Sequence, residues 1–244
     1  MPDAPLLTLE PVPPPPDTSA SDTSAPDTSA KDTAKSLRTR ARILDCATRL
    51  LVEIGYAAAT NAKIAEAAGL TRGAMLYHFP TREALVEAVV GHLHAARTAM
   101  LAQASDRAPS GADLAEHAID AYWSLLHEPA FVAFAELEAA ARTDPAVRAS
   151  LTRAQAAFDQ AQEGSDFSRM LQAGVGPRFQ ASRDLARFML EGLWRAQLTY
   201  DKDARVANLL AVVKRVTHML NRKGDLQDPW PDDGRHAASG DPPD

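Results

Sequence analysis

Apolar side chains between residues 35 and 221 recur at spacings of three and four positions, the period of an α-helix that buries one face. No segment in this range shows the strict alternation typical of a half-buried strand. Gly and Pro steps, together with a loop expected between Gly164 and Pro177, divide the pattern into about nine helices. The pattern therefore predicts an all-α protein.

The first predicted helix ends at Gly55, a residue type that suits the turn after a helix. A short second helix begins after Thr60, whose hydroxyl can cap it, and stops at Gly69. Thr71 caps a third short helix, which Pro80 prevents from continuing. The apolar face of the first helix comprises Ile43, Leu44, Ala47, Leu50, Leu51 and Ile54.

The two short helices, joined by the turn Gly69-Leu70-Thr71, predict a helix-turn-helix. The second helix of such a motif enters the major groove of DNA with its N-terminal end. We therefore expect Arg72, Gly73 and Ala74 to face base edges. The alternative is an ordinary helical corner whose side chains only pack. Flanking side chains with donors suited to phosphate oxygens are Thr71, Tyr77, His78 and Arg82.

The charge distribution supports the DNA-binding reading of this segment. The whole chain has a net charge of −6. Residues 1–34 contain six acids and one lysine, whereas residues 35–82 contain eight cations and three acids. A segment of charge +5 thus lies inside an acidic chain, where a polyanion would bind.

The two ends of the chain lack the apolar periodicity of a folded segment. Residues 1–34 repeat Asp-Thr-Ser-Ala after a proline run, and residues 222–244 are rich in Pro, Gly and Asp, so both are expected to be disordered tails. The sequence shows no secretory signal and no run of about 18 apolar residues that would span a membrane, so we expect a cytoplasmic protein. A single cysteine, Cys46, excludes an internal disulfide.

Residues 42–86 resemble the TetR/AcrR family of transcriptional regulators. The resemblance is densest in Ile64-Ala65-Glu66-Ala67-Ala68-Gly69-Leu70-Thr71-Arg72-Gly73-Ala74 and in His78-Phe79-Pro80-Thr81-Arg82-Glu83-Ala84-Leu85. It implies that residues 35–82 form the DNA-binding domain. It also implies DNA contacts by Thr71, Arg72, Tyr77, His78 and Arg82, and by Asn61 and Lys63 in the second helix. One departure is Leu76, where the family commonly has tyrosine.

The same resemblance implies that residues 83–221 form a regulatory and dimerisation domain. The last two helices, about 182–200 and 203–220, are expected to build the interface of a homodimer. The alternative is that the apolar stripe of the final helix packs only within its own subunit. That stripe comprises Val206, Leu209, Leu210, Val213, Val216 and Leu220.

An effector pocket is expected within this second domain. Large side chains that are candidates to line it are Trp123, His127, Phe131, Phe134, Phe167, Met170, Phe188 and Trp194, although core packing is the commoner role of such residues. Polar candidates are Glu138, Arg183, Glu191 and Arg195. This mixture favours an apolar or amphipathic effector. His92 and His94 lie on diverging helix faces, so neither a metal site nor a cofactor is expected.

The resemblance implies a two-state dimer that binds operator DNA and is released by a small molecule, most simply a repressor. The sequence contains no nucleophile elbow, phosphate loop or His-Glu-x-x-His motif, so we do not expect an enzyme. A rival reading is a helical small-molecule-binding or interaction protein that has lost DNA binding, which only Leu76 supports.

Overall fold

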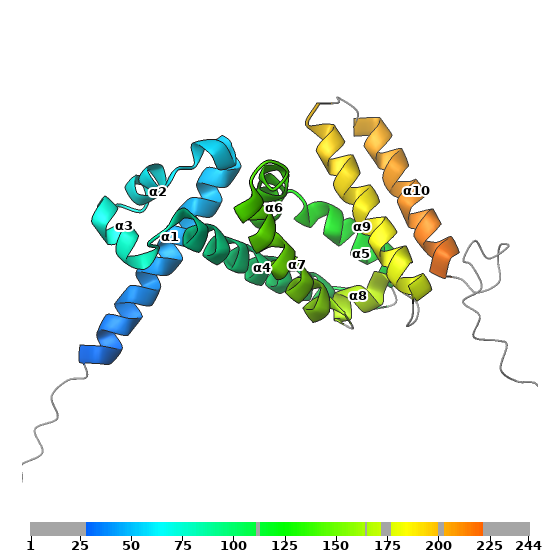
Figure 1. The fold of residues 1–244 in the computed structure, drawn as a ribbon. Coiled ribbons are helices and arrows are strands. Elements are labelled where there is room, and N and C mark those ends of the chain that lie inside the picture. Colours follow the sequence, from blue (N-terminus) through cyan, green and yellow to red (C-terminus); the bar gives the residue numbers. More distant parts are fainter. Residues whose placement is uncertain (1–27, 111–112, 164, 172–176, 200–202, 222–244) are drawn as a thin grey trace, which may run out of the picture.

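The computed structural model describes residues 28–110, 113–163, 165–171, 177–199 and 203–221, and these form ten helices and no strand (Figure 1). The expectation of an all-α fold is confirmed. The helices are α1 (Thr28–Ala58), α2 (Asn61–Ala67), α3 (Arg72–His78), α4 (Arg82–Asp106), α5 (Leu114–Leu125), α6 (Pro129–Ala140), α7 (Pro145–Gln162), α8 (Asp166–Leu171), α9 (Pro177–Gln197) and α10 (Asp203–Asn221).

Three boundaries differ from the sequence-based expectation, one of them the start of α9 at Pro177 instead of about residue 182. Helix α1 begins at Thr28, so residues 28–34 are helical, whereas they were expected in the tail. Helix α8 lies inside the segment expected as a loop, because Phe167 and Leu171 bury one side of a single short helix. The rest of the two predicted tails, 1–27 and 222–244, lies outside the described residues.

Threonine and aspartate side chains begin the helices as their positions predict. The hydroxyl oxygens of Thr60, Thr71 and Thr81 accept hydrogen bonds from the amides three residues later, at 3.4, 3.2 and 3.1 Å. Asp113 and Asp144 cap α5 and α7 in the same way. The predicted end of the first helix is also correct, because Gly55 has a φ of 75° and interrupts α1.

The buried residues form two clusters along the molecule. The first joins α1–α3 to the start of α4 and to α6, and the second joins the end of α4 to α5, α8, α9 and α10. Helix α1 packs on α6, α4 packs on α7, and α9 packs on α10. Helices α2 and α3 therefore lie at one end of the molecule, and α9 and α10 at the other (Figure 1).

The apolar stripe of the last helix faces mostly inward. Val206 and Val213 are buried, and Leu210 packs against the second cluster. Leu209 is exposed, and with Val212 it begins a second apolar face. Val206, Leu210 and Val213 thus pack within their own subunit, and a homodimer interface on the last two helices stays a prediction.

No helix in the described part of the chain has both the length and the apolar character that crossing a membrane requires.

Candidate nucleic-acid interface and effector cavity

The turn between α2 and α3 is closed by backbone hydrogen bonds. Gly69 has a φ of 63°, a conformation that glycine adopts without a steric penalty. Its amide donates to the Glu66 carbonyl at 2.9 Å, and the Leu70 amide donates to the Ala65 carbonyl at 2.8 Å. This pair of bonds is a Schellman motif, which ends α2 sharply and lets α3 leave in a new direction.

Helix α3 buries one face and exposes the other. Met75 and Phe79 are almost fully buried in the first cluster. Arg72, Gly73 and Thr71 are exposed, and Tyr77 is 80 % exposed. The Thr71 hydroxyl accepts from the Ala74 amide and keeps its own hydrogen for another acceptor. The structure therefore exposes Thr71, Arg72, Gly73 and Tyr77, whereas Ala74 and His78 are half-buried.

Of the remaining predicted DNA contacts, one side chain is exposed and two are hydrogen-bonded within the protein. Lys63 is exposed, as a phosphate contact requires. The Arg82 guanidinium, in contrast, donates from Nη1 to the Ala59 carbonyl at 2.7 Å and to Asn61 Oδ1 at 3.2 Å. Its Nη2 donates to the Tyr56 carbonyl at 3.3 Å. In this conformation Arg82 and Asn61 hold the start of α2 against α4.

Arg40 supports the end of α3, a role that the sequence reading missed. Its Nη1 donates to the His78 carbonyl at 2.6 Å, and its guanidinium carbon lies 4.3 Å from the centre of the Phe79 ring. The bond satisfies a carbonyl left open at the helix end. The available signal was its spacing: Arg40 precedes Ile43 and Ala47 by three and seven positions, which places it on the buried face of α1.

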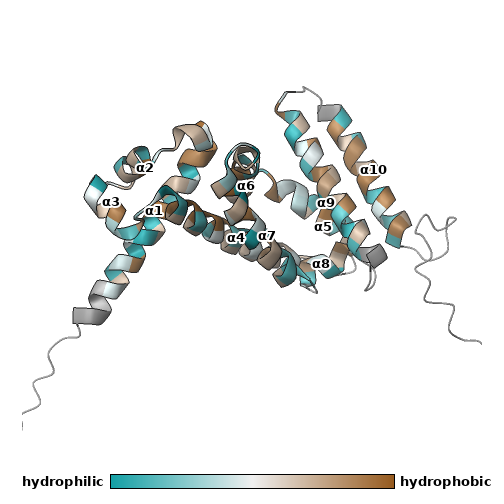
Figure 2. Cartoon of the chain, viewed as in Figure 1, coloured by the Kyte–Doolittle hydropathy of each residue, from teal (hydrophilic) through white to brown (hydrophobic). Residues whose placement is uncertain are grey.

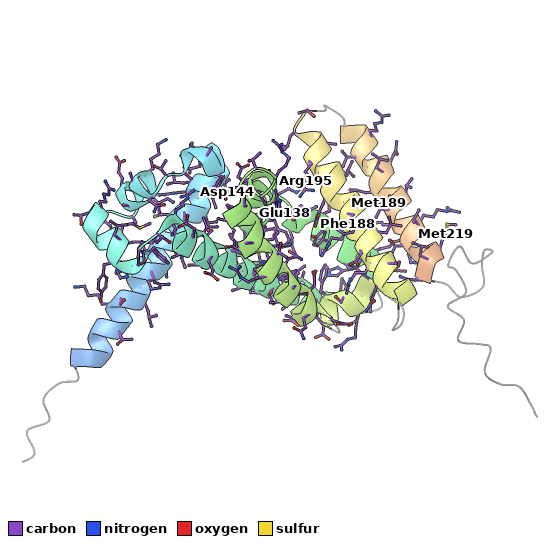
Figure 3. The ribbon with its side chains drawn as sticks, viewed as in Figure 1. Glu138, Asp144, Phe188, Met189, Arg195 and Met219 are labelled. Carbon is purple, nitrogen blue, oxygen red and sulfur yellow. The ribbon has the colours of Figure 1, made fainter. Side chains whose placement is uncertain are left out.

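Tyr56, directly after Gly55, links the N-terminal helices to α6 and to the start of α7. The Tyr56 amide donates to Glu136 Oε1 at 2.9 Å, and the Tyr56 hydroxyl donates to Asp144 Oδ2 at 2.8 Å. Burial, and then the bond to Asp144, raise the pKa of Tyr56. The Tyr56 hydroxyl in turn lowers the pKa of Asp144, which is labelled in Figure 3. These bonds join positions 80 and 88 residues apart.

A small cavity of about 50 Å³, part of it open to solvent, lies between α4, α5, α7, α8 and α9. Phe167 is the predicted aromatic that lines it, and Arg183 is the predicted polar side chain that does so. The other lining residues are Arg97, Leu101, Tyr122, Phe158, Asp159, Gln162, Ser168, Leu171 and Arg187. The other four helices follow α4 at increasing distances along the chain, so no local sequence pattern predicts that these residues line one cavity.

The other predicted aromatic residues lie around the cavity or away from it. Phe131 and Phe134 are buried behind Arg97. His127 is exposed, with its ring against Trp123 at a centroid distance of 5.4 Å. Phe188 is 57 % exposed on α9. Met170 and Trp194 are half-buried and pack against the second cluster. Effector contact by these residues stays a prediction.

Arg97 is a buried cation that the sequence reading missed. Its guanidinium carbon lies 4.9, 4.0 and 4.8 Å from the ring centres of Phe131, Phe134 and Phe158. Burial lowers the pKa of Arg97. The signal was its spacing: Leu93, Arg97 and Leu101 recur every four residues, so a cation occupies a core position of α4.

His94 lies one turn before Arg97 and is also buried. Its ring packs against Phe134 and Phe158 at centroid distances of 4.9 and 4.8 Å. Burial, followed by the charge of Arg97, lowers the pKa of His94 to about 4, while Asp159 acts in the opposite direction. His94 is therefore a neutral ring at neutral pH, next to a cation.

The acidic groups near the cavity already have partners. The Tyr122 hydroxyl donates to Glu191 Oε1 at 2.8 Å, and burial raises the pKa of Tyr122. Glu138 and Arg195 form an ion pair at 2.7 Å between α6 and α9, and both are labelled in Figure 3. Within the described residues no group of three His, Cys, Asp or Glu side chains is placed to hold a metal ion.

Comparison with known proteins finds sequence relatives of the N-terminal part of the chain. Residues 43–89 match the model of the family described as bacterial regulatory proteins, tetR family. The HTH-type transcriptional regulator TtgR of Pseudomonas putida is 46 % identical over 56 residues, which are 23 % of this chain and 27 % of TtgR. The uncharacterized HTH-type transcriptional regulator YvkB of Bacillus subtilis (strain 168) is 38 % identical over 65 residues, which are 27 % of this chain and 34 % of YvkB. The match thus spans about a quarter to a third of these relatives.

Solved structures extend the likeness over most of the chain. A putative TetR-family transcriptional regulator from Rhodococcus sp. superposes with a TM-score of 0.56 at 19 % identity, covering 76 % of this chain and 100 % of that one. The multidrug binding protein EbrR, complexed with imidazole, superposes with a TM-score of 0.52 at 23 % identity, covering 72 % of this chain and 88 % of EbrR. At these identities the likeness shows the fold.

Proposed function

We propose that this chain, which carries a TetR-family N-terminal domain on a TetR-like helical fold, is a dimeric transcriptional regulator whose operator binding is controlled by a small molecule. In this proposal residues 35–82 are the DNA-binding head, and residues 83–221 hold the dimer interface and the effector cavity. Its simplest form is a repressor, acting in the cytoplasm and without catalytic activity.

The exposed surface of α3 carries the proposal. Arg72 and Gly73 leave the helix start open to a base edge, and Tyr77 exposes a large aromatic side chain that no core residue covers. The buried side of the same helix is fixed by Met75 and Phe79. A short helix held so firmly on one side, with a cation and hydroxyl donors on the other, fits the recognition helix of a helix-turn-helix.

Exposed apolar side chains on α9 and α10 support the homodimer. They are Leu185, Phe188, Leu209, Val212 and Met219. The apolar character of α10 is visible in Figure 2. Exposed apolar side chains on the two helices farthest from the head suit a two-fold interface between two copies of this chain. Such a dimer would present two heads to successive major grooves, roughly 34–36 Å apart.

The control of DNA binding by a ligand is supported by the connection between cavity and head. Helix α4 begins at Arg82, which holds the start of α2, and continues to Arg97 and Leu101 in the cavity wall. Tyr56 provides a second connection through Glu136 and Asp144. A ligand that binds better to one arrangement of these helices would shift the population of heads able to bind both half-sites.

The test is binding of the full-length protein to fragments of its own upstream region, measured by fluorescence anisotropy at several salt concentrations. We expect saturable binding that weakens steeply with salt, because cations displace counterions from phosphates. Arg72→Ala should weaken binding by about 5- to 100-fold, the range for losing one base contact. Arg107→Ala is the matched control, since Arg107 is an exposed arginine at the other end of α4.

Equal affinity for upstream and random fragments, together with no effect of Arg72→Ala, would overturn the proposal. That result would favour the rival reading, a helical binding protein that no longer recognises DNA. The same experiment therefore separates the two functions.

A further inference from the structure

Arg97 has incomplete hydrogen bonding at the wall of the cavity. Its side chain is 5 % exposed, and its Nε and Nη1 atoms have no acceptor among the described residues. The three aromatic rings around it attract the face of the guanidinium group, but its N–H bonds point outward in the guanidinium plane. A buried cation is costly when its donors meet neither water nor an acceptor.

The neighbouring arginines differ from Arg97 because acids pair with them. Arg183 Nη2 lies 3.0 Å from Asp184 Oδ1, and Arg187 Nη1 lies 3.5 Å from Asp159 Oδ1. Arg187 Nε lies 3.8 Å from Glu191 Oε1, an ion pair that is too long for a hydrogen bond. Arg97 and Arg187 both line the cavity, but only Arg187 is paired with acids there.

The rest of the wall is largely apolar. Leu101, Phe158, Phe167 and Leu171 come from three helices and are buried around the cavity. Among the described residues of the wall, the one acidic side chain is Asp159, which is half-exposed and already paired with Arg187. A ligand that fits this wall needs an apolar body and one group that accepts hydrogen bonds from arginine.

We propose that the cavity binds an amphipathic carboxylate, whose anionic group accepts hydrogen bonds from Arg97 and whose apolar body lies against Phe158, Phe167 and Leu171. A carboxylate matches the planar fork of a guanidinium group and forms strong charge-assisted bonds with it. An alcohol or amide of the same shape offers a weaker acceptor, and an amine is repelled by Arg97, Arg183 and Arg187. The role of this anion as the effector rests on the proposed function, whereas its binding does not.

The first experiment compares matched ligands on the full-length protein. Isothermal titration calorimetry is run with decanoate and 4-phenylbutanoate, and with the alcohols and primary amines of the same carbon skeletons. The two acids distinguish a fatty body from an aromatic one. We expect at least one acid to bind about 10- to 100-fold more tightly than its alcohol, which is the range for a charge-assisted hydrogen bond, and the amines to bind least.

The second experiment removes the cation. Arg97→Met keeps an unbranched side chain without charge, and replacing a buried charge by an apolar group is commonly tolerated in the fold. We expect this variant to lose the preference for acid over alcohol while it still binds the alcohol. Arg153→Met is the matched control, because Arg153 lies on α7 with an exposed side chain outside the cavity. Circular dichroism verifies the fold of both variants.

The outcomes separate this inference from the proposed function. Equal affinity of wild-type protein for acid and alcohol, or an acid preference that persists in Arg97→Met, overturns the anion site whether or not the chain binds DNA. Selective acid binding that depends on Arg97 supports the site even if no operator is found. Release of bound operator fragments by the same acid, over its measured Kd range, then tests its role as effector.

Discussion

The proposed DNA-binding head and the proposed effector cavity differ in the sequence distance between their hydrogen-bonded polar groups. In the head, Thr60, Thr71 and Thr81 bond amides three residues away. Around the cavity, Tyr122 bonds Glu191 across 69 positions, while Arg97 leaves two donors without an acceptor among the described residues. The turns of the head are thus closed by local bonds, to which Arg40 and Arg82 add bonds from 21 to 38 positions away, whereas the cavity depends on the convergence of distant helices.

This difference has a physical consequence for stability. Locally closed turns hold their geometry whatever is bound elsewhere, which suits a surface that must match a rigid DNA groove. A wall whose buried arginine lacks a protein acceptor gains stability from a ligand that supplies one. We therefore expect the head to be sensitive to loss of packing, and the cavity region to be sensitive to pH and ligand.

The largest expected effect is on core packing. Phe79 is almost fully buried in the head, so Phe79→Ala should lower the free energy of unfolding by about 3–5 kcal/mol. Phe167→Ala should cost less, about 2–3 kcal/mol, because one side of that ring already borders empty space. Urea denaturation followed by circular dichroism measures both. An equal or larger loss for Phe167→Ala would contradict the comparison.

The second effect is a loss of stability at acid pH from His94. Its pKa is about 4 in the folded chain and 6.5 as a free side chain, so between these values the unfolded chain binds a proton that the folded chain does not. Stability should therefore fall as the pH drops from 6.5 to 4, by about 3 kcal/mol for this residue. Burial is the main cause, Arg97 on α4 adds to it, and Asp159 on α7 opposes it.

Urea denaturation at several pH values measures this effect. His94→Phe should flatten the profile between pH 6.5 and 4, since the unfolded chain then gains no proton at this position. His127→Phe is the control, because His127 has an exposed side chain on the outside of the bundle. A profile that keeps its full slope in His94→Phe would show that other groups cause it.

The third effect compares two glycines. At Gly55, a Cβ atom would lie 2.9 Å from Glu136 Oε1, in a backbone conformation of φ 75° and ψ 168° that only glycine adopts readily. Gly55→Ala should cost about 2–3 kcal/mol and disturb the Tyr56–Glu136 bond. Gly69→Ala, with no atom within 4 Å of its Cβ, should cost about 1 kcal/mol. Thermal denaturation ranks the two, and the reverse order would contradict the steric argument.

The smallest effect concerns Leu76, which is 39 % exposed on α3. Leu76→Tyr adds a phenol hydroxyl where a phosphate oxygen is expected, and should raise operator affinity about fivefold. Leu76→Phe adds the ring without the hydroxyl and should leave affinity nearly unchanged. Anisotropy titrations at one salt concentration compare the three proteins. Identical affinities for the tyrosine and phenylalanine variants would exclude a phosphate contact here.

The helix-turn-helix was predictable because its signals are short. A capping threonine, a glycine with positive φ and a proline after a helix each act within about four residues, so the sequence identifies Thr71, Gly69 and Pro80 directly. Arg82 shows the limit of prediction from such short signals. Its bonds to the Ala59 and Tyr56 carbonyls depend on a bend 23 and 26 residues earlier.

The cavity was only partly predictable, because its wall is set by which helices converge. The sequence suggests Phe131 and Phe134 as pocket residues because they are large and aromatic. In the structure both rings pack against Arg97 instead. Helical spacing alone puts Arg97 on the buried face of α4, although it does not show that the opposite wall leaves space. The size of that space follows from packing between helices, which one sequence does not reveal.

Helix α4 also has a mechanical consequence. It holds Arg82 at the head and Arg97 at the cavity, 15 positions apart, which is about 22 Å of straight helix. A rod of that length that pivots at the cavity by about 5° displaces its far end by about 2 Å. In the proposed symmetric dimer the two displacements would add, to about a tenth of the groove repeat that both copies must span. A small rotation of α4 at the cavity would thus become a change in the spacing of the two heads.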